Sequence, residues 1–550
     1  MEPFENAIEN PNFSSLRFTV PPTVSPNPNP GVPLAALLRF CVNKPVRTVV
    51  SVSDGERQWD LHFDRPPERG LPILGMRPGR RHVFRVSIVD VSGSEVRFPH
   101  DLTFTTPPLP AGREAFPPLQ VTVSEPARME PGVTLLSVRR RVPGQPDLNA
   151  RYGLLLAVDA QGEVVWFYRT DVRISDVTCL WNGNLLYMTA DFRAIEIDWL
   201  GNVVASWYAA GRPQGPAEGI AVDTLTFHHH MIELPSGNLL VLGSELREVE
   251  DYWSSETDPL APRQPAGVMG DEIVEFRRDG TVVWQWRAFD KLDPYRIGYD
   301  TFFPYWTNRG FPGARDWTHG NRLYYDARED ALIVSLRMQD AVLNIDRTSG
   351  EIRWIAGDPS GWPAALQDRL LSAEGGMRWF YHQHASSLTP SGTLLLYDNG
   401  NHLVRPFTPA VSVNETYSRA VEYAVDTARG TLREVWASDE PGPEAVVTYA
   451  MGEADYLSQT GNVLVSYGLC LPQGEERLTW DNALRFSPWT RVREMTHTTP
   501  PHILWEVVLR DETEGSPVGW TLFGAQRLSA LPFHRDLSSS GRQFSGFSRG

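Results

Sequence analysis

Repeated turn and strand signals along most of this 550-residue sequence predict an all-β fold: a six-bladed β-propeller preceded by a small N-terminal β-sandwich. Three observations support the prediction. A degenerate repeat recurs between about residues 130 and 540, six segments of that repeat end in Trp, and almost no convincing helical pattern interrupts them. An array of β-sandwiches or a solenoid is the alternative architecture for such a repeat.

The repeat has two halves. One half is a turn followed by an apolar strand, in which Gly-Asn and similar pairs supply the positive-φ residues of tight hairpins. It occurs five times, at 182–186, 236–240, 330–334, 391–395 and 460–464. The other half is a strand, a turn and a strand ending in Trp, and its copies end at Trp166, Trp207, Trp284, Trp354, Trp436 and Trp505. The later copies are spaced more widely, so blades three to six are expected to carry insertions, which commonly build active-site mouths.

The flanking segments predict the remaining organisation. Residues 1–32 are rich in Pro and Asn and are expected to form an extended arm. Residues 33–107 contain several alternating runs separated by turns, which predicts a fibronectin-like β-sandwich. A Pro-rich linker over 108–130, a propeller catalytic domain over 131–540 and a tail over 541–550 complete the chain, and 519–527 is expected to supply a closing strand.

Composition argues against several functions and locations. The formal net charge of −16 argues against a nucleic-acid partner, and no window approaches the roughly 20 apolar residues of a membrane helix. The N-terminus has no basic segment followed by an apolar one, so a cytoplasmic location is expected, or a periplasmic or secreted one if a leader was removed. The three cysteines, Cys41, Cys179 and Cys470, lie too far apart for a disulfide framework or a Cys-rich zinc site.

The histidines are unevenly distributed. Three adjoin at 228–230, one is His319, and His382 and His384 lie close together. When the Pro-Ser-Gly turns are aligned, His229 and His384 each precede the proline by six residues, and His319 takes nearly the same place in the blade between. Because innermost propeller strands surround the central channel, these three imidazoles are expected to converge there. A single histidine would more often be structural, but three at equivalent positions indicate a site.

These motifs resemble the PAPS-independent bacterial arylsulfotransferases (aryl-sulfate sulfotransferases), in which a six-bladed propeller follows an N-terminal β-sandwich. The family's His-Gly-Asn motif, with an arginine eighteen residues on, resembles His319, Asn321 and Arg337. Its Gln-His nucleophile motif resembles Gln383-His384. Its His before Leu-Pro-x-Gly-Asn resembles His229, with His228 as an alternative because the tripled histidine obscures the register. The sequence departs from the family at His230, where an Asp is expected, and in lacking the close cysteine pair that exported members can carry.

The resemblance implies roles for eight residues. The catalytic ones are His384, His319, His229, Arg337 and Asn321, and the substrate-binding ones are His228, Gln383 and His382. It implies ping-pong transfer of a sulfuryl group from an aryl sulfate donor to a phenolic acceptor through a sulfohistidine at His384, with no metal or other cofactor. A neutral imidazole is a competent nucleophile, and Arg337 and Asn321 would bind the equatorial sulfate oxygens. His229 or His319 would protonate the leaving phenolate and later deprotonate the acceptor.

Two other functions fit the sequence. A metal-dependent propeller oxygenase or hydrolase would use His229, His319, His384 and His382 as ligands, although the fixed charge of Arg337 disfavours a nearby cation. A non-catalytic binding propeller is the second alternative, since a fold does not determine a function. The expected partners are small molecules, with no nucleic acid and no membrane. The natural donor and acceptor and the oligomeric state, a homodimer included, stay open.

Overall fold

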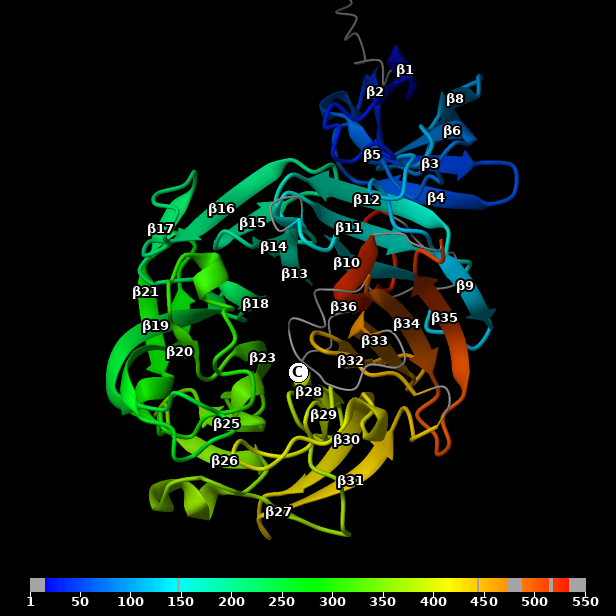
Figure 1. Cartoon of the computed structure of the whole chain (residues 1–550). Coiled ribbons are helices and arrows are strands. Elements are labelled where there is room, and N and C mark those ends of the chain that lie inside the picture. The colour runs from blue at the N-terminus through cyan, green and yellow to red at the C-terminus, as the bar shows by residue number, and fades with distance from the viewer. Residues whose placement is uncertain (1–14, 146–148, 443–444, 472–486, 514–517, 534–550) are drawn as a thin grey trace, which may run out of the picture. The chain divides into compact units, whose positions relative to one another are not determined.

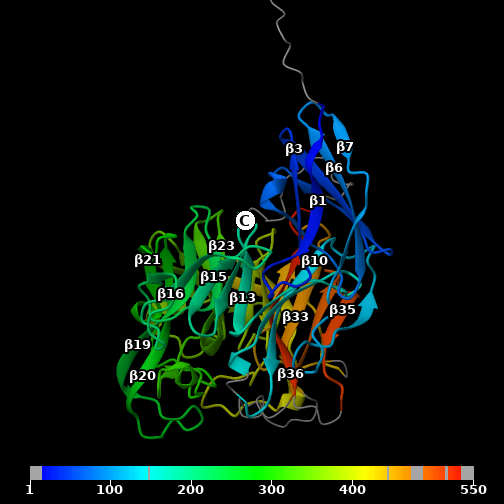
Figure 2. The same ribbon diagram turned by 90° about the horizontal axis from the view of Figure 1, so that it is seen from above.

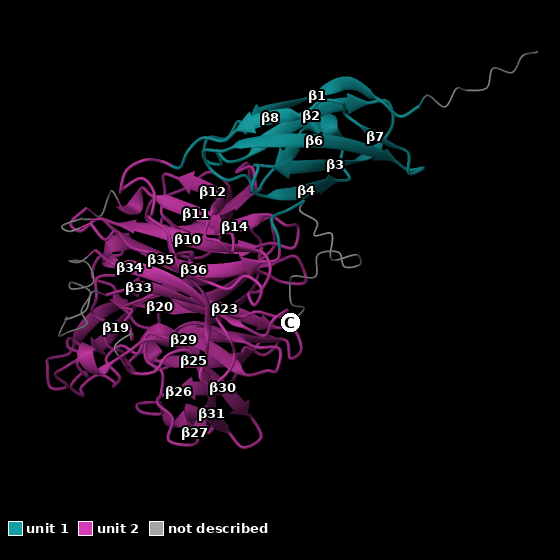
Figure 3. Cartoon of the chain, turned by 90° about the vertical axis from the view of Figure 1, so that its right-hand side faces the viewer, with its two compact units in different colours: residues 1–109, 530–543 teal, residues 110–529, 544–550 magenta. Residues whose placement is uncertain are grey.

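The computed structural model describes residues 15–145, 149–442, 445–471, 487–513 and 518–533. The chain divides into two compact units, residues 1–109 with 530–543 and residues 110–529 with 544–550 (Figure 3). Regular structure in the described ranges is nearly all strand. The named helical elements there are short 3-10 helices: η1 (Pro67–Arg69), η2 (Ala288–Asp290), η3 (Thr307–Arg309), η4 (Arg337–Gln339), η5 (Ala364–Arg369) and η6 (Val413–Glu415). Within the same ranges no helix is long and apolar enough to cross a membrane.

The first unit is a β-sandwich of two sheets. One sheet has the order β1-β2-β5, and the other has the order β4-β3-β6-β7 with β8 paired to β6. The strands are β1 (Phe18–Pro26), β2 (Ala36–Val42), β3 (Val46–Ser53), β4 (Gln58–Phe63), β5 (Leu71–Ile73), β6 (Arg81–Asp90), β7 (Glu95–Arg97) and β8 (Leu102–Thr105). Alternate residues of β6, such as Phe84 and Val86, join Leu38 and Phe40 of β2 in one buried apolar cluster. The period-2 alternation of the sequence therefore places one face of each sheet in the core.

The limits of this unit differ from those expected. Strand β1 lies within residues 1–32, where an extended arm was predicted, and it pairs with β2 at a sheet edge. An edge strand tolerates Pro21 and Pro22 because the missing amides are not needed for the ladder, so the Pro content did not exclude a strand. At the other end of the chain, the Phe533 ring packs 5.1 Å from that of Phe63, so residues 530–533 belong to the first unit although the sequence assigned them to the propeller.

The second unit contains, within its described residues, six sheets built from antiparallel meanders and arranged as a ring (Figure 1). From the innermost strand outward the first is β36 (Gly519–Leu528), β10 (Val133–Arg141), β11 (Gly153–Val158) and β12 (Val164–Thr170). The second is β13 (Ile174–Cys179), β14 (Leu185–Thr189), β15 (Arg193–Ile197), β16 (Val203–Ala209) and β17 (Ile220–Val222). The third is β18 (His228–Glu233), β19 (Leu239–Tyr252), β20 (Gln264–Phe276) and β21 (Val282–Arg287), with β22 (Arg315–Asp316) paired to β20.

The other three sheets follow the same plan. The fourth is β23 (Gly320–Asp326), β24 (Ala331–Leu336), β25 (Ala341–Asp346) and β26 (Ile352–Gly357). The fifth is β28 (His384–Leu388), β29 (Leu394–Asp398), β30 (Arg419–Asp426), β31 (Thr431–Ala437) and β27 (Ser372–Ala373). The sixth is β32 (Glu453–Tyr456), β33 (Val463–Cys470), β34 (Trp489–Met495), β35 (Ile503–Leu509) and β9 (Gln120–Ser124).

The sequence repeat corresponds to fixed positions in these sheets. The Gly-turn half begins the second strand of sheets two to six, and Gly183 and Gly392 of those turns have φ of 84° and 83°, as tight hairpins require. The six repeat tryptophans all lie on the fourth strand, for example Trp166 on β12 and Trp505 on β35. Both of these side chains are fully buried. The repeat thus specifies one four-stranded unit at a time.

The ring is closed at two places. The C-terminal strand β36 pairs with β10 as the innermost strand of the first sheet, which confirms the closing strand expected at 519–527. Strand β9 pairs with β35 as an outer strand of the sixth sheet, although the sequence predicted a linker at that position. Each innermost strand contacts that of the next sheet, and β36, which lies beside β33 in Figure 2, contacts both β32 and β13. The predicted all-β propeller is therefore confirmed, and the closed ring leaves few free edges.

Candidate active site

Where the innermost strands meet, a cavity of about 880 Å³ is lined by residues of five sheets and by residues that adjoin strands of the fourth. Five of the eight predicted site residues line it, namely His228, His229, His319, Arg337 and His384. The ring centroid of His229 lies 4.7 Å from that of His319 and 6.3 Å from that of His384. Asn321, Gln383 and His382 are buried but do not line the cavity. The three imidazoles expected to converge therefore do so, whereas Asn321, Gln383 and His382 lie outside the cavity lining.

The backbone that presents these histidines is irregular. His229 and His319 both have left-handed φ values, 57° and 52°, which are uncommon for a non-Gly residue. The ladders of β18, β23 and β28 each shift register at the start of the strand. Such bulges re-aim side chains and are common beside active sites. His319 and Arg337 face each other across the open end of the β23–β24 hairpin, where the amide of Arg337 donates to the His319 carbonyl at 3.1 Å.

The His384 ring is fixed as a neutral tautomer with a free nitrogen. Its Nδ1 lies 2.8 Å from the carbonyl oxygen of Gly452, which can only accept, so Nδ1 carries the proton and Nε2 has an available lone pair. Burial lowers the pKa of His384 to about 3, against the opposing effect of the Gly452 carbonyl. His384 is therefore a neutral imidazole at neutral pH, with its proton on Nδ1 and a lone pair on Nε2, as nucleophilic attack requires.

His319 has a carboxylate partner. Its Nδ1 lies 2.5 Å from Oδ2 of Asp316, whose other oxygen accepts a hydrogen bond from Nε1 of Trp306 at 2.9 Å. The carboxylate orients the ring and stabilises an imidazolium, which leaves Nε2 of His319 to exchange protons in the cavity. Asp316 was not among the predicted site residues, although its position three residues before His319 offered a signal.

His228 and His229 form a hydrogen-bonded pair. Their Nδ1 atoms lie 2.9 Å apart, and Nε2 of His228 faces the Gly243 carbonyl at 2.9 Å and Oδ1 of Asp271 at 3.1 Å. Nε2 of His228 therefore carries a proton, and the two Nδ1 atoms share a hydrogen bond between the rings. Burial, followed by the neighbouring His319, lowers the pKa of His229 well below its usual value. His228 therefore holds the His229 ring in place at the wall of the cavity.

Arg337 is buried at the cavity wall, with 4% of its surface exposed. Its Nη2 donates to Oδ2 of Asp300 at 3.4 Å and to the Tyr449 carbonyl at 3.3 Å, and the Tyr449 hydroxyl donates to the same Asp300 oxygen at 2.8 Å. Despite burial, His402 and Arg337 hold the pKa of Asp300 well below its usual value. Asp300 is therefore an anion that orients the guanidinium, and its position was not predicted from the sequence.

The side chains of Asn321 and Gln383 form hydrogen bonds with backbone groups near His384. Nδ2 of Asn321 donates to the Gln383 carbonyl at 2.8 Å, and its Oδ1 accepts from the Ala385 amide at 3.2 Å. Gln383 donates from Nε2 to the carbonyl of Ala341 at 2.8 Å, which fastens the start of β28 to the fourth sheet. Both side chains therefore position His384, whereas the sequence analysis placed Asn321 on the sulfate and Gln383 on the substrate.

One group in the described residues has the composition of a metal site. Asp300, His382 and His402 offer ligand atoms within 4.8 Å of one another. The Arg337 guanidinium, however, lies against the same carboxylate, and its fixed charge disfavours a cation there. The metal alternative from the sequence required His382 to join His229, His319 and His384. His382 instead packs beside His402, with ring centroids 5.2 Å apart, and does not line the cavity.

Aromatic and cationic residues that the sequence did not single out complete the cavity. The Tyr305 ring lies 6.0 Å from that of His229, nearly parallel to it, and 4.6 Å from that of His319. The Phe523 ring meets that of His384 edge-on at 5.5 Å. Arginines also line the wall, at positions 139, 141, 173 and 309. These residues come from insertions and from strands far apart in the chain, so no spacing in the sequence relates them to the histidines.

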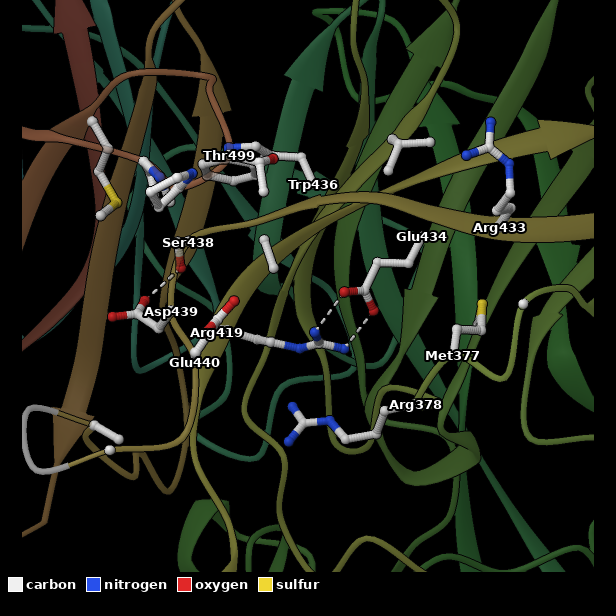
Figure 4. A pocket seen from close by; sticks show the side chains of 18 of the residues that line it. Met377, Arg378, Arg419, Arg433, Glu434, Trp436, Ser438, Asp439, Glu440 and Thr499 are labelled. Carbon is white, nitrogen blue, oxygen red and sulfur yellow. Dashed lines mark hydrogen bonds and ion pairs between the residues drawn. The ribbon is translucent and has the colours of Figure 1, made fainter.

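A second cavity of the propeller unit, of about 840 Å³, contains none of the predicted site residues. Figure 4 shows Arg419 with two guanidinium nitrogens bonded to Glu434, both at 2.9 Å. Arg378, on the same wall, forms an ion pair with Asp398 at 2.6 Å. The guanidinium groups of Arg378 and Arg419 are thus paired with carboxylates of the protein.

Comparison with known proteins identifies a family for this chain. Residues 120–500 match the model of the family described as arylsulfotransferase (ASST). The arylsulfate sulfotransferase AssT of Escherichia coli is 28% identical over 253 residues, which are 38% of this chain and 39% of that protein. The protein of the same name from Lelliottia amnigena is 27% identical over 338 residues, 51% of each chain. The chain thus spans about half the length, or less, of the curated relatives that it matches.

Among solved structures, the β-propeller domain of Cps50 (Swd1) from Myceliophteria thermophila is 13% identical. The match covers 72% of this chain and 100% of that one with a TM-score of 0.30, too low to support an inference.

Proposed function

We propose that this chain, which belongs to the arylsulfotransferase family, moves a sulfuryl group from an aryl sulfate donor to a phenolic acceptor through a sulfohistidine at His384. The observation that carries the proposal is the unprotonated Nε2 of His384 in a cavity that also holds Arg337, His229 and His319. Sulfuryl transfer, like phosphoryl transfer, needs an in-line nucleophile and fixed positive charge at the equatorial oxygens. His384 and Arg337 are the candidates for these two roles.

In the first half-reaction Nε2 of His384 attacks sulfur. The nitrogen–sulfur bond forms as the bond between sulfur and the phenolic oxygen breaks, and the leaving phenolate takes a proton. The guanidinium of Arg337, oriented by Asp300, stabilises charge on the sulfuryl oxygens. We assign the proton transfer to His319, because its Asp316 partner stabilises the imidazolium form that a general acid needs. His229, whose pKa is strongly lowered by burial, stays neutral and borders the sulfuryl group.

The second half-reaction reverses these steps with a new phenol. Neutral His319 removes the proton of the acceptor hydroxyl, the acceptor oxygen attacks sulfur, and the nitrogen–sulfur bond breaks to restore His384. The rings of Tyr305 and Phe523 flank the histidines and suit an aromatic substrate. Because one cavity serves donor and acceptor in turn, the donor phenol leaves before the acceptor enters, and ping-pong kinetics are expected.

The test is direct detection of the intermediate. The enzyme is mixed with p-nitrophenyl sulfate in the absence of acceptor, quenched in alkali and digested, and the peptide containing His384 is examined by mass spectrometry. The expected result is an added sulfuryl mass on that peptide and a burst of one equivalent of p-nitrophenol. In steady-state assays that vary both donor and acceptor, parallel double-reciprocal plots are expected.

Two variants serve as the test and the control of this experiment. His384→Asn should abolish the burst and the added mass. His502→Asn, at an exposed position directly before β35 and outside the cavity, should retain both. Intersecting double-reciprocal plots, or full transfer activity in His384→Asn, would contradict the sulfohistidine route.

A further inference from the structure

Three arginines form a cationic wall in the central cavity. Arg139 comes from β10, Arg173 directly precedes β13, and Arg309 ends η3. Arg139 donates from Nε to the Ile174 carbonyl at 2.9 Å, and Arg309 donates from Nη1 to the Tyr305 carbonyl at 2.9 Å. Nε of Arg173 is buried and has no hydrogen-bond partner in the part of the chain that the structure describes. Most of the donors of these guanidinium groups are thus uncommitted.

Their charges are also uncompensated. Within the described ranges, none of the three forms an ion pair with a carboxylate, although the chain has 67 acidic residues against 51 basic ones. Burial and the nearby Arg141 lower the pKa of Arg139 to about 9, and burial and Arg309 lower that of Arg173 well below its usual value. In the second cavity, by contrast, Arg419 is paired with Glu434. Arg139 is buried and Arg173 and Arg309 are half-buried. Positive charge withdrawn from water without a partner is costly, so a ligand is the natural counter-ion.

One sulfuryl group does not account for this wall. In the proposed mechanism Arg337 and the three histidines contact the transferred sulfuryl group, and the positive charge of Arg337 is paired with Asp300. The Tyr305 ring connects the two parts of the cavity: it packs against His229 and His319, and the Arg309 guanidinium lies over it, 3.5 Å from its centroid. The Tyr305 ring thus contacts both Arg309 of the cationic wall and the two histidines.

We propose that Arg139, Arg173 and Arg309 bind a second anionic group on the aromatic substrate, a carboxylate, sulfonate or further sulfate at the end of the ring remote from the transferred group. This inference rests on the proposed function for the identity of that transferred group. The enzyme then selects phenols and aryl sulfates that carry an additional negative charge over neutral ones. Planar guanidinium groups with free donors match the oxygens of such anions.

The test compares two acceptors of matched size with p-nitrophenyl sulfate as donor: 4-hydroxybenzoate, which is anionic, and 4-hydroxybenzamide, which is neutral. The native enzyme should show the higher kcat/KM with 4-hydroxybenzoate. A hydrogen bond to a charged group contributes enough that Arg173→Met and Arg309→Met should each lower this kcat/KM about 10-fold or more. The kcat/KM for 4-hydroxybenzamide should stay within about twofold. Arg433→Met, an exposed arginine of the second cavity, is the control and should change neither value.

Binding without turnover separates the two proposals. Calorimetry with benzene-1,4-disulfonate and with benzenesulfonate should show tighter binding of the disulfonate, and Arg173→Met should remove the difference. If this holds while no sulfuryl transfer occurs, the anion site stands and the proposed function fails. If transfer occurs but the native enzyme treats the two acceptors alike, or Arg173→Met and Arg309→Met weaken both equally, the anion site is refuted.

Discussion

Replacement of Asn321 by Ala distinguishes a residue that touches sulfate from one that holds the nucleophile in place. The side chain bonds the Gln383 carbonyl on one side of His384 and the Ala385 amide on the other. Ala385 has a φ of 54°, a left-handed conformation that a non-Gly residue keeps only when its surroundings impose it. Without Asn321 the strand is free to relax, and His384 moves with it.

The magnitude follows from these contacts. A buried carbonyl and a buried amide are each left unpaired at a cost of about 1–3 kcal/mol, so Asn321→Ala should destabilise the protein by about 2–6 kcal/mol. A displacement of the nucleophile by about 1 Å can lower the rate about 100-fold. We therefore expect the rate of His384 sulfation at saturating donor to fall by about that factor while the KM for donor stays near the native value, because Asn321 does not line the cavity.

The assay is a stopped-flow burst with p-nitrophenyl sulfate, together with urea unfolding of the same preparation. Asn462→Ala is the matched control: Asn462 is also a buried amide with two bonds, to the Arg128 carbonyl and to Glu494, but lies outside the cavity. It should lose comparable stability with an unchanged burst rate. A large rise in donor KM in Asn321→Ala, with unchanged stability and burst rate, would refute the positioning role and restore the direct contact with sulfate.

Three further predictions follow from the site. Asp316→Asn removes the carboxylate that stabilises the His319 imidazolium. The kcat should therefore fall about 100-fold for aryl sulfates with basic leaving groups but little for p-nitrophenyl sulfate. A uniform loss across leaving groups would contradict the assignment of His319 as the general acid. The folded pKa of His384, about 3, lies below the unfolded value of about 6.5. Between these pH values the unfolded state binds more protons, so the free energy of unfolding falls as the pH falls. Urea unfolding should therefore show that, between pH 6.5 and pH 5, His384→Asn loses about 2 kcal/mol less stability than the native protein does. Dialysis against EDTA should leave transfer unchanged, and a loss restored by zinc would instead favour a metal at Asp300, His382 and His402.

Local sequence patterns predicted much of the fold. The alternation of Gly-containing turns and apolar runs placed the second strand of five sheets, and the recurrent Trp marked the fourth strand of all six. These signals are reliable because a turn and its two strands are neighbours in sequence. The domain limits were harder to predict: β1 resembled an arm because an edge strand tolerates Pro, and β9 resembled a linker because its partner β35 lies far along the chain.

The sequence by itself also determined which histidines would meet, because equivalent positions of successive repeats converge on the axis of any propeller. Only the tertiary structure decided what each of them does. The Gly452 carbonyl that fixes the His384 tautomer, the Asp300 that orients Arg337 and the Asp271 behind His228 lie on other elements of the ring. The same holds for the arginine wall, whose members lie on β10, before β13 and on η3. The sequence repeat specifies the strands of each sheet, because those strands are neighbours along the chain. The protonation states of the histidines and the electrostatic field in the cavity depend instead on burial and on charged residues of neighbouring sheets, and no spacing along the chain encodes these.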